Sequence, residues 1–190
     1  MTIENKLDLR IGIVVILILL AAFSRLIPHM PNFSPLGAMG LFGVAYISKK
    51  WQAFLIPIAA AWVSDLFINN VIYAQYYQKF IWFYQGFYWQ YGSYLLIAIA
   101  GVFIFRKVNA KRVIAGALTS AVIFFLVSNF GVWVSGTMYP KTFEGLLTCY
   151  VAGIPFVKGT LLGDLFYSTA LFGTFALVQR QFPVLQLKNM

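Results

Sequence analysis

The residue of this sequence with the greatest capacity for chemistry is Asp164, which lies within the last long apolar stretch, a predicted span over 155–178. It lies roughly nine residues into that span, about 14 Å along a helix rising about 1.5 Å per residue. A carboxylate at that depth costs about 3 kcal/mol on insertion scales, so it should face the bundle interior and have a partner. Two interpretations stay open: a structural hydrogen bond between helices, or a contact to a ligand or ion in a central cavity. Polar side chains at helical spacing share its face, namely Thr160, Tyr167, Ser168 and Thr174.

Two other predicted spans carry polar side chains that favour the bundle interior. Asp65 lies near the outer end of the third span, and Asn69 follows one helical turn later on the same face. Asn129 and Trp133 are likewise one turn apart near the end of the fifth span. Asp65 is either a helix-end residue in the headgroup zone or part of the wall of the cavity that holds Asp164.

Costly polar groups on three spans are easiest to satisfy together. We therefore predict that Asp65, Asn129 and Asp164 converge in the outer half of the bundle. Lys158, with its long stem, or Tyr167 is expected to satisfy one carboxylate.

The segment from Ile27 to Pro35 contains three prolines, which restrict its backbone. A stiff outer loop can hold His29 and Asn32 over a pocket without a large ordering cost. The structural alternative is that Ser34 and Pro35 only begin the next helix, as its N-cap and first helical residue.

Aromatic residues dominate the stretch from Tyr73 to Tyr91, where they occupy eleven of nineteen positions. Tyrosine and tryptophan collect at membrane interfaces, because the ring is buried while its polar tip stays wet. The alternative is an aromatic lid, including Trp82 and Trp89, that stacks on a flat organic ligand. Tyr139, in the next outer loop, is a further candidate ligand contact, and Phe143 to Ala152 is expected to form a short interfacial helix.

Several kinds of chemistry are excluded by what the chain lacks. It has one cysteine, Cys149, and one histidine, His29, which rules out an intramolecular disulfide and any zinc site of several Cys or His ligands. It has no His-Glu-x-x-His sequence and no Walker A loop. We expect no cofactor, no bound metal and no enzymatic activity, and we expect Cys149 to be an inert buried thiol.

The composition places these residues in a membrane. The chain of 190 residues is 61% hydrophobic and only 10% charged, whereas soluble domains carry about 25% charged residues. We predict one all-α membrane domain over residues 1–190, a bundle of six transmembrane helices. The predicted spans cover about 9–26, 33–48, 51–68, 88–105, 113–134 and 155–178.

The cations predict the orientation. With six spans, ten of the fourteen Lys and Arg residues fall on the side that holds both termini and four on the other. The positive-inside rule therefore places both termini in the cytoplasm, and we expect a multi-pass protein of the bacterial inner membrane. The net charge of +9 is explained by these loops, without nucleic acid as a partner. The outer connections, near 27–34, 69–87 and 135–154, are the longer ones, so the working face should be the outer one.

Two resemblances add to this interpretation. Six short spans, cytoplasmic termini and three longer outer loops resemble the substrate-binding S components of energy-coupling-factor (ECF) vitamin transporters, in which outer loops and outer helix halves form the ligand pocket. The chain is also similar to an uncharacterised family of small bacterial six-span proteins. That likeness rests on Pro28-His29-Met30-Pro31-Asn32-Phe33-Ser34-Pro35, Ser64-Asp65-Leu66, Asn129-Phe130-Gly131-Val132-Trp133, Tyr139-Pro140-Lys141-Thr142 and Gly163-Asp164-Leu165-Phe166-Tyr167.

These resemblances imply a membrane transport protein that captures a small, partly aromatic, vitamin-like nutrient from the outer side. S components often carry Ala-x-x-x-Ala in the first helix for docking onto an energising module, whereas this helix has only the adjacent Ala21 and Ala22. The missing motif argues against such a partner and leaves a solitary transporter open. The alternative function is a non-transporting membrane subunit whose aromatic outer loops contact a partner protein.

Overall fold

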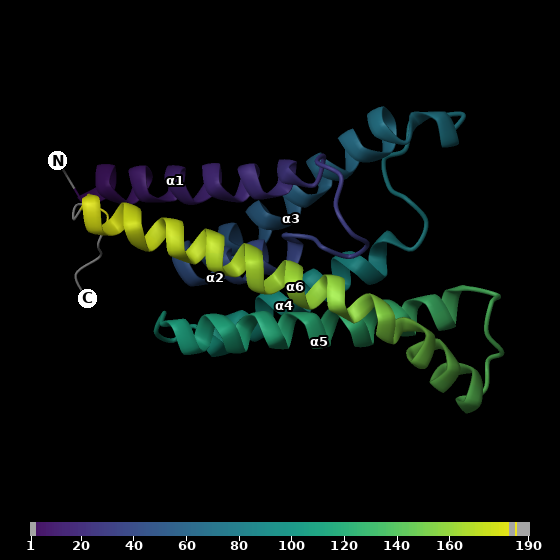
Figure 1. Ribbon diagram of the computed structural model, residues 1–190. Coiled ribbons are helices and arrows are strands. Elements are labelled where there is room, and N and C mark those ends of the chain that lie inside the picture. The colour runs from purple at the N-terminus through teal and green to yellow at the C-terminus, as the bar shows by residue number, and fades with distance from the viewer. Residues whose placement is uncertain (1–2, 183–184, 186–190) are drawn as a thin grey trace.

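The computed structural model describes residues 3–182 and residue 185, and within them the chain is entirely helical. Figure 1 shows the helices packed along one another in an elongated bundle. In chain order they are α1 (Ile3–Ser24), α2 (Leu36–Tyr46), α3 (Lys50–Phe67), a π-helical turn η1 (Ile68–Ile72), a short 3-10 turn η2 (Ala74–Tyr76), α4 (Phe87–Ile104), α5 (Ala110–Ser135) and α6 (Phe143–Gln181).

Five of the α-helices are long and apolar enough to cross a membrane, which suggests a multi-pass membrane protein. The exception is α2, which has eleven residues and replaces the predicted span over 33–48. At about 1.5 Å per residue it extends roughly 16 Å, about half of the ~30 Å hydrocarbon core. The chain before α2 must therefore enter the bundle to about half its depth before the helix begins.

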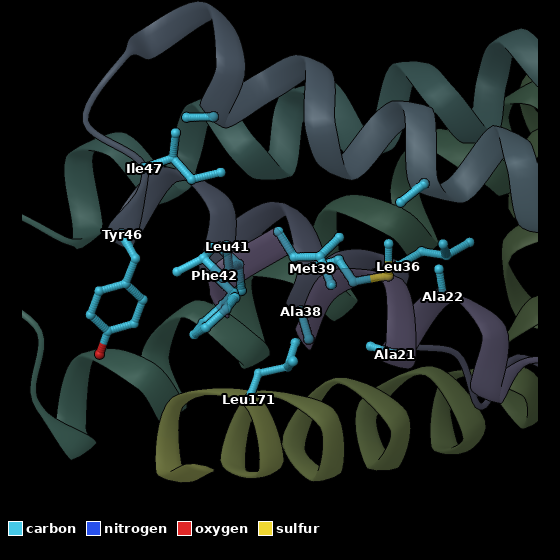
Figure 2. Packing of buried hydrophobic residues seen from close by; sticks show 14 of the residues in the cluster. Ala21, Ala22, Leu36, Ala38, Met39, Leu41, Phe42, Tyr46, Ile47 and Leu171 are labelled. Carbon is cyan, nitrogen blue, oxygen red and sulfur yellow. The ribbon is translucent and has the colours of Figure 1, made fainter. Parts of the chain in front are cut away.

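The short helix α2 is the centre of the bundle, since it packs against each of the other five α-helices. It carries no charged residue, and its first eight residues are all buried, as expected for a helix that is apolar on every side. Glycine spacing permits these contacts: a Cβ at Gly43 would come within 2.7 Å of the Pro57 ring on α3. Figure 2 shows Ala38 of α2 close to Leu171 of α6 within this apolar core.

A buried cation packs against aromatic residues of the apolar core. Arg10 of α1 is only 8% exposed, and its guanidinium lies over the rings of Tyr46 and Phe175, at 5.6 and 5.9 Å from their centroids. Such contacts offset part of the cost of burying the charge. Hydropathy alone did not reveal that this charged residue of the first predicted span faces the interior of the bundle.

The predicted interfacial helix over 143–152 and the predicted span over 155–178 belong to one continuous helix, so the prediction of a separate short helix was wrong. α6 runs unbroken for 39 residues with Pro155 inside it. Proline removes one backbone hydrogen bond and bends a helix more often than it ends one when packing supports both sides. Figure 1 shows α6 bending in its first part, where it diverges from α5.

The ends of the bundle differ. The start of α1 and the end of α6 lie together at one end, while the connections after α1, α3 and α5 lie at the other (Figure 1). We call this second end the loop end. Local signals set its elements: Gly86, with a φ of 81°, ends the long aromatic connection immediately before α4.

Candidate functional site

A central cavity of about 250 Å³ lies under the loop end, between α2, α4, α5 and α6. Its walls combine apolar and polar side chains, which is the usual composition of a small-molecule site. The apolar wall includes Ile68, Tyr94, Ile97 and Phe124. The polar lining includes Arg25, His29, Asn32, Gln90, Thr160 and Asp164.

Asp164 is the most deeply buried charge of this cavity, at 2% exposure. Its Oδ2 atom has no hydrogen-bond partner among the described residues. Two serine hydroxyls of the same cavity wall, Ser34 Oγ and Ser120 Oγ, are also buried without a partner there. Because unpaired buried polar atoms are costly, three of them on residues that line one cavity favour an occupant that supplies the missing bonds.

The start of α2 explains the position of the carboxylate. Pro35 occupies the N-cap of α2 and, in the described part of the chain, no side chain of α2's own supplies a cap. Asp164 lies instead beside the backbone N–H of Ala38, in the first turn of α2, and beside Ser120. A helix N-terminus carries a partial positive charge, so it stabilises a nearby anion. The Asp164 carboxylate therefore lies where a capping side chain of α2 would lie, although it comes from another helix, and its Oδ2 atom is left without a partner in the described part of the chain.

The proline-containing loop lies on a glycine surface of α6. The backbone of Pro31 packs against Gly159, and that of Ser34 against Gly163, where a Cβ would come within 2.7 Å of the Ser34 nitrogen. Asn32, between them, has a left-handed φ of 61°, which asparagine tolerates better than most residues.

Phe33 also fixes this loop, because its ring contacts the rings of Phe166 and Tyr167 at centroid distances of 5.6 and 5.5 Å. As predicted for a stiff loop, His29 and Asn32 are held at the cavity, where both side chains remain exposed. Their contact with a ligand stays a prediction.

Asp65 has a different partner from the one expected. Nη1 of Arg25 lies 2.7 Å from Asp65 Oδ1 and donates to Ser64 Oγ at 2.6 Å. The Tyr91 hydroxyl donates to the other carboxylate oxygen of Asp65 at 2.6 Å. Both oxygens of Asp65 are therefore satisfied, and the group that reaches the cavity is Arg25, which lies just beyond α1.

Gln90 is a further polar group of the cavity. Its Oε1 accepts hydrogen bonds from the Tyr84 hydroxyl at 2.9 Å and the Tyr94 hydroxyl at 3.3 Å. Burial, with a smaller contribution from the charge of Asp65, raises the pKa of Tyr84 in the aromatic connection before α4, so its hydroxyl stays protonated and remains a donor. The amide of Gln90 is thereby oriented, because its oxygen is occupied by these tyrosines.

Asn129 and Tyr139 line a second cavity, which we call the side cavity, of about 290 Å³ between α5 and α6. It shares Asn32, Gln90 and Phe124 with the central cavity, so the two are separated by single side chains. The Asn129 side-chain amide donates to the Phe125 carbonyl at 2.8 Å. The backbone carbonyl of Asn129 accepts from the Cys149 thiol at 3.4 Å.

The predicted convergence of three polar groups is therefore wrong in its partners and in its place. Asp164 lines the central cavity, Asn129 the side cavity, and Asp65 pairs with Arg25. Lys158 is exposed and lines neither cavity. The Tyr167 hydroxyl accepts from Ser24 Oγ at 2.8 Å, so it joins α6 to α1 and not to a carboxylate. Sequence spacing places residues on one helix, but the rotation of that helix decides which of them meet.

The remaining predicted residues lie in connections and helix ends at the loop end. Asn69 lines a shallow space of about 280 Å³ beside Lys79, apart from the central cavity. Trp82 stacks on Trp62, with ring centroids 6.3 Å apart and planes 17° from parallel. Trp82 is 60% exposed, so a lid over the central cavity is not its position here.

Trp89 and Trp133 make contacts at the loop-end parts of α4 and α5. The Trp89 indole donates to Ser135 Oγ at 2.8 Å, and its ring packs against Gly131. The Trp133 indole donates to the Pro140 carbonyl at 2.8 Å, while the Lys141 ammonium bonds to the Trp133 carbonyl. Neither tryptophan lines the central cavity, so the interpretation of these rings as a ligand-stacking lid has no support in their placement.

Sequence reasoning missed several lining residues: Arg25, Ser120, Gln90, Tyr94 and Phe124. Ser120 lies inside an apolar span, and the pair Gly159 and Gly163 has the four-residue spacing of close helix contacts, so both carried a signal. Arg25 was counted as a loop cation, and nothing local indicates that it pairs with Asp65. Within residues 3–182 and 185, no group of three or more His, Cys, Asp or Glu side chains could hold a metal ion.

No curated protein and no solved structure matches this chain. Residues 5–185, which are nearly the whole chain, match a family of unknown function (DUF6580), and the protein belongs to that family.

Proposed function

We propose that this protein is a membrane transport protein that binds a small nutrient molecule in the central cavity, from the side of the loop end. The observation that carries this proposal is the set of buried oxygens without partners, Asp164 Oδ2 with Ser34 Oγ and Ser120 Oγ, on one cavity wall. A buried group left unpaired costs about 1–3 kcal/mol, and more when it is charged. A bound molecule that donates to these atoms would recover that free energy.

The competing explanation is that Asp164 has only a structural role as the cap of α2. That role accounts for the position of the carboxylate beside the Ala38 N–H. It does not account for the cavity itself, nor for Oδ2, which faces no partner in the described part of the chain. A purely structural carboxylate would be expected to lie in a closed interior, with both oxygens satisfied as those of Asp65 are.

Access from the outer side is supported by the geometry of the loop end and by the charges. The proline-containing loop brings His29 and Asn32, both exposed, to the rim of the cavity. The ten-to-four division of cations favours this end as the outer one. Capture under outer loops is the mode of ECF S components, which the chain resembles in its architecture, and no docking motif supports a shared energising module.

A second candidate is a non-transporting subunit that contacts a partner protein through the outer aromatic connection. It is favoured by the exposure of that connection, where Tyr76 is 72% and Trp82 60% exposed. An aromatic belt in the lipid headgroup region explains the same exposure without a partner. The transport proposal ranks first because only it uses the cavity.

Native mass spectrometry of the gently purified full chain tests the proposal. We expect a retained small molecule on the wild-type protein and its loss from Asp164→Asn, which keeps the side-chain shape but removes the charge. Tyr167→Phe is the matched control, because it lies one turn away on α6 and bonds to Ser24 outside the cavity. If broad metabolite screening finds no small molecule that binds, the partner-subunit function replaces this one.

A further inference from the structure

The central cavity also indicates the chemical class of its ligand. We propose that it binds a small zwitterion, with the ammonium group on Asp164, Ser120 and Ser34 and the carboxylate towards Arg25. This inference rests on the proposed function, because it specifies what the same cavity holds.

The inner wall of the cavity matches an ammonium group. An alkylammonium has three N–H donors and no acceptor. Three residues that line the cavity carry a buried oxygen without a partner in the described part of the chain, namely Ser34 Oγ, Ser120 Oγ and Asp164 Oδ2, and one of these is a carboxylate oxygen. An anion at this position would meet the Asp164 charge at 2% exposure, where screening by solvent is weak.

The opposite charge is supplied by Arg25. Guanidinium has five N–H donors, and in the described part of the chain both contacts of Arg25 are made by Nη1, to Asp65 and Ser64. Arg25 lines the cavity, and no other atom of its guanidinium is buried without a partner. Nε and Nη2 are therefore accessible to a carboxylate, for which the planar guanidinium is a suitable partner.

The rest of the cavity limits the ligand in size and shape. A volume of about 250 Å³ is below the range of about 300–1,000 Å³ for drug-sized sites. It is too large for a single inorganic cation, since it equals the liquid volume of about eight waters. The lining also includes Tyr94, Ile97 and Phe124, which favour a compact apolar or aromatic body.

Three sets of matched probes test this assignment by thermal stabilisation of the purified full chain. The first set is the twenty protein amino acids, the second the corresponding amines without the carboxylate, and the third the corresponding acids without the amine. We expect at least one amino acid to stabilise the wild-type protein, its amine to bind more weakly, and its acid not to bind. Asp164→Asn should weaken the binding of that amino acid and of its amine by about tenfold or more.

The carboxylate end is tested with the double variant Arg25→Gln, Asp65→Asn, which removes the cation without leaving an unpaired charge. It should weaken binding of the amino acid and leave the affinity for the matched amine unchanged. Lys158→Gln, an exposed cation on α6, is the control and should change neither affinity.

Each other outcome decides against the zwitterion. If only acids, neutral metabolites or sodium ions stabilise the protein, the cavity binds a ligand of another class and the proposed function stands without this inference. The zwitterion assignment is likewise overturned, and the proposed function stands, if stabilising amino acids bind the Asp164→Asn variant with unchanged affinity. If no amine or amino acid binds, the zwitterion is overturned, and if a broad metabolite screen also finds no ligand, the proposed function fails with it.

Discussion

Asp164 and Gly37 meet where α6 crosses the first turn of α2: a Cβ at Gly37 would come within 2.5 Å of Asp164 Oδ1. The absence of a side chain at position 37 is what allows the carboxylate to reach the start of a helix that lacks a cap of its own. Asp164 also lines the central cavity, and its Oδ2 atom is buried without a partner in the described part of the chain. One residue therefore contributes to the packing of α2 and to the candidate site.

Gly37→Ala should destabilise the protein and abolish binding in the central cavity. The added methyl group would overlap Ser120 Oγ and Asp164 Oδ1, and overpacking of this kind costs about 1–3 kcal/mol. Thermal denaturation and ligand retention measure the two effects. Gly12→Ala on α1 is the matched control, because a Cβ there meets no atom within 4 Å, and alanine is the better helix former. Equal stability of the two variants would contradict the close contact of α2 and α6.

Asp65→Asn should destabilise the bundle by about 3 kcal/mol, because it leaves the partly buried Arg25 cation without its partner. Arg25→Gln alone should lower the stability by a similar amount, because it leaves the Asp65 carboxylate without its partner. The double variant should be clearly less destabilised than the sum of the two, as expected for residues in direct contact. Additive losses in a thermal or denaturant series would show that the ion pair contributes nothing.

Gly163→Ala should displace the proline-containing loop from α6. A Cβ there would come within 2.7 Å of the Ser34 nitrogen. The nearest atoms are all backbone atoms of the loop, so no flexible side chain can move aside. With Cys149 replaced by serine, a cysteine at position 32 should react faster with a thiol reagent in the Gly163→Ala background. Gly173→Ala, where a Cβ meets no atom within 4 Å, should leave that rate unchanged. An unchanged rate in both backgrounds would mean that the glycine surface does not position the loop.

The orientation is tested with single cysteines in the same background. Positions 48 and 109 lie in the short connections between α2 and α3 and between α4 and α5, at the same end of the bundle as the start of α1. Position 78 lies in the aromatic connection at the loop end. A membrane-impermeant reagent applied to intact cells should label position 78 and spare positions 48 and 109. Labelling at 109 with protection of 78 would reverse the orientation and remove the argument for capture from outside.

The class of the protein and its helices could be predicted from the sequence, because hydropathy and cap residues are local properties. The long apolar runs predict the helices, although the fifth was predicted from residue 113 and α5 begins at Ala110, where Asn109 accepts from the Arg112 N–H at 3.0 Å. Asp164 could be singled out for the same reason, since an acid in an apolar run is costly wherever the run lies. The prolines likewise predict that the loop before α2 is restricted. The errors at this level are boundaries, as at Pro155, where packing keeps α6 continuous.

The partners of the polar side chains were decided only by the tertiary structure. Asp65 pairs with Arg25, which is 40 residues away along the chain, and Asp164 lies against the first turn of α2 instead of pairing with Lys158 on its own helix. These pairings depend on how each helix is rotated and on how closely the backbones approach, which glycines such as Gly37 and Gly163 permit. An apolar helix has no strong preference for one face in lipid, so its sequence periodicity does not fix that rotation. The sequence by itself therefore determined that buried polar groups must find partners, and the packing of six helices determined which partners they found.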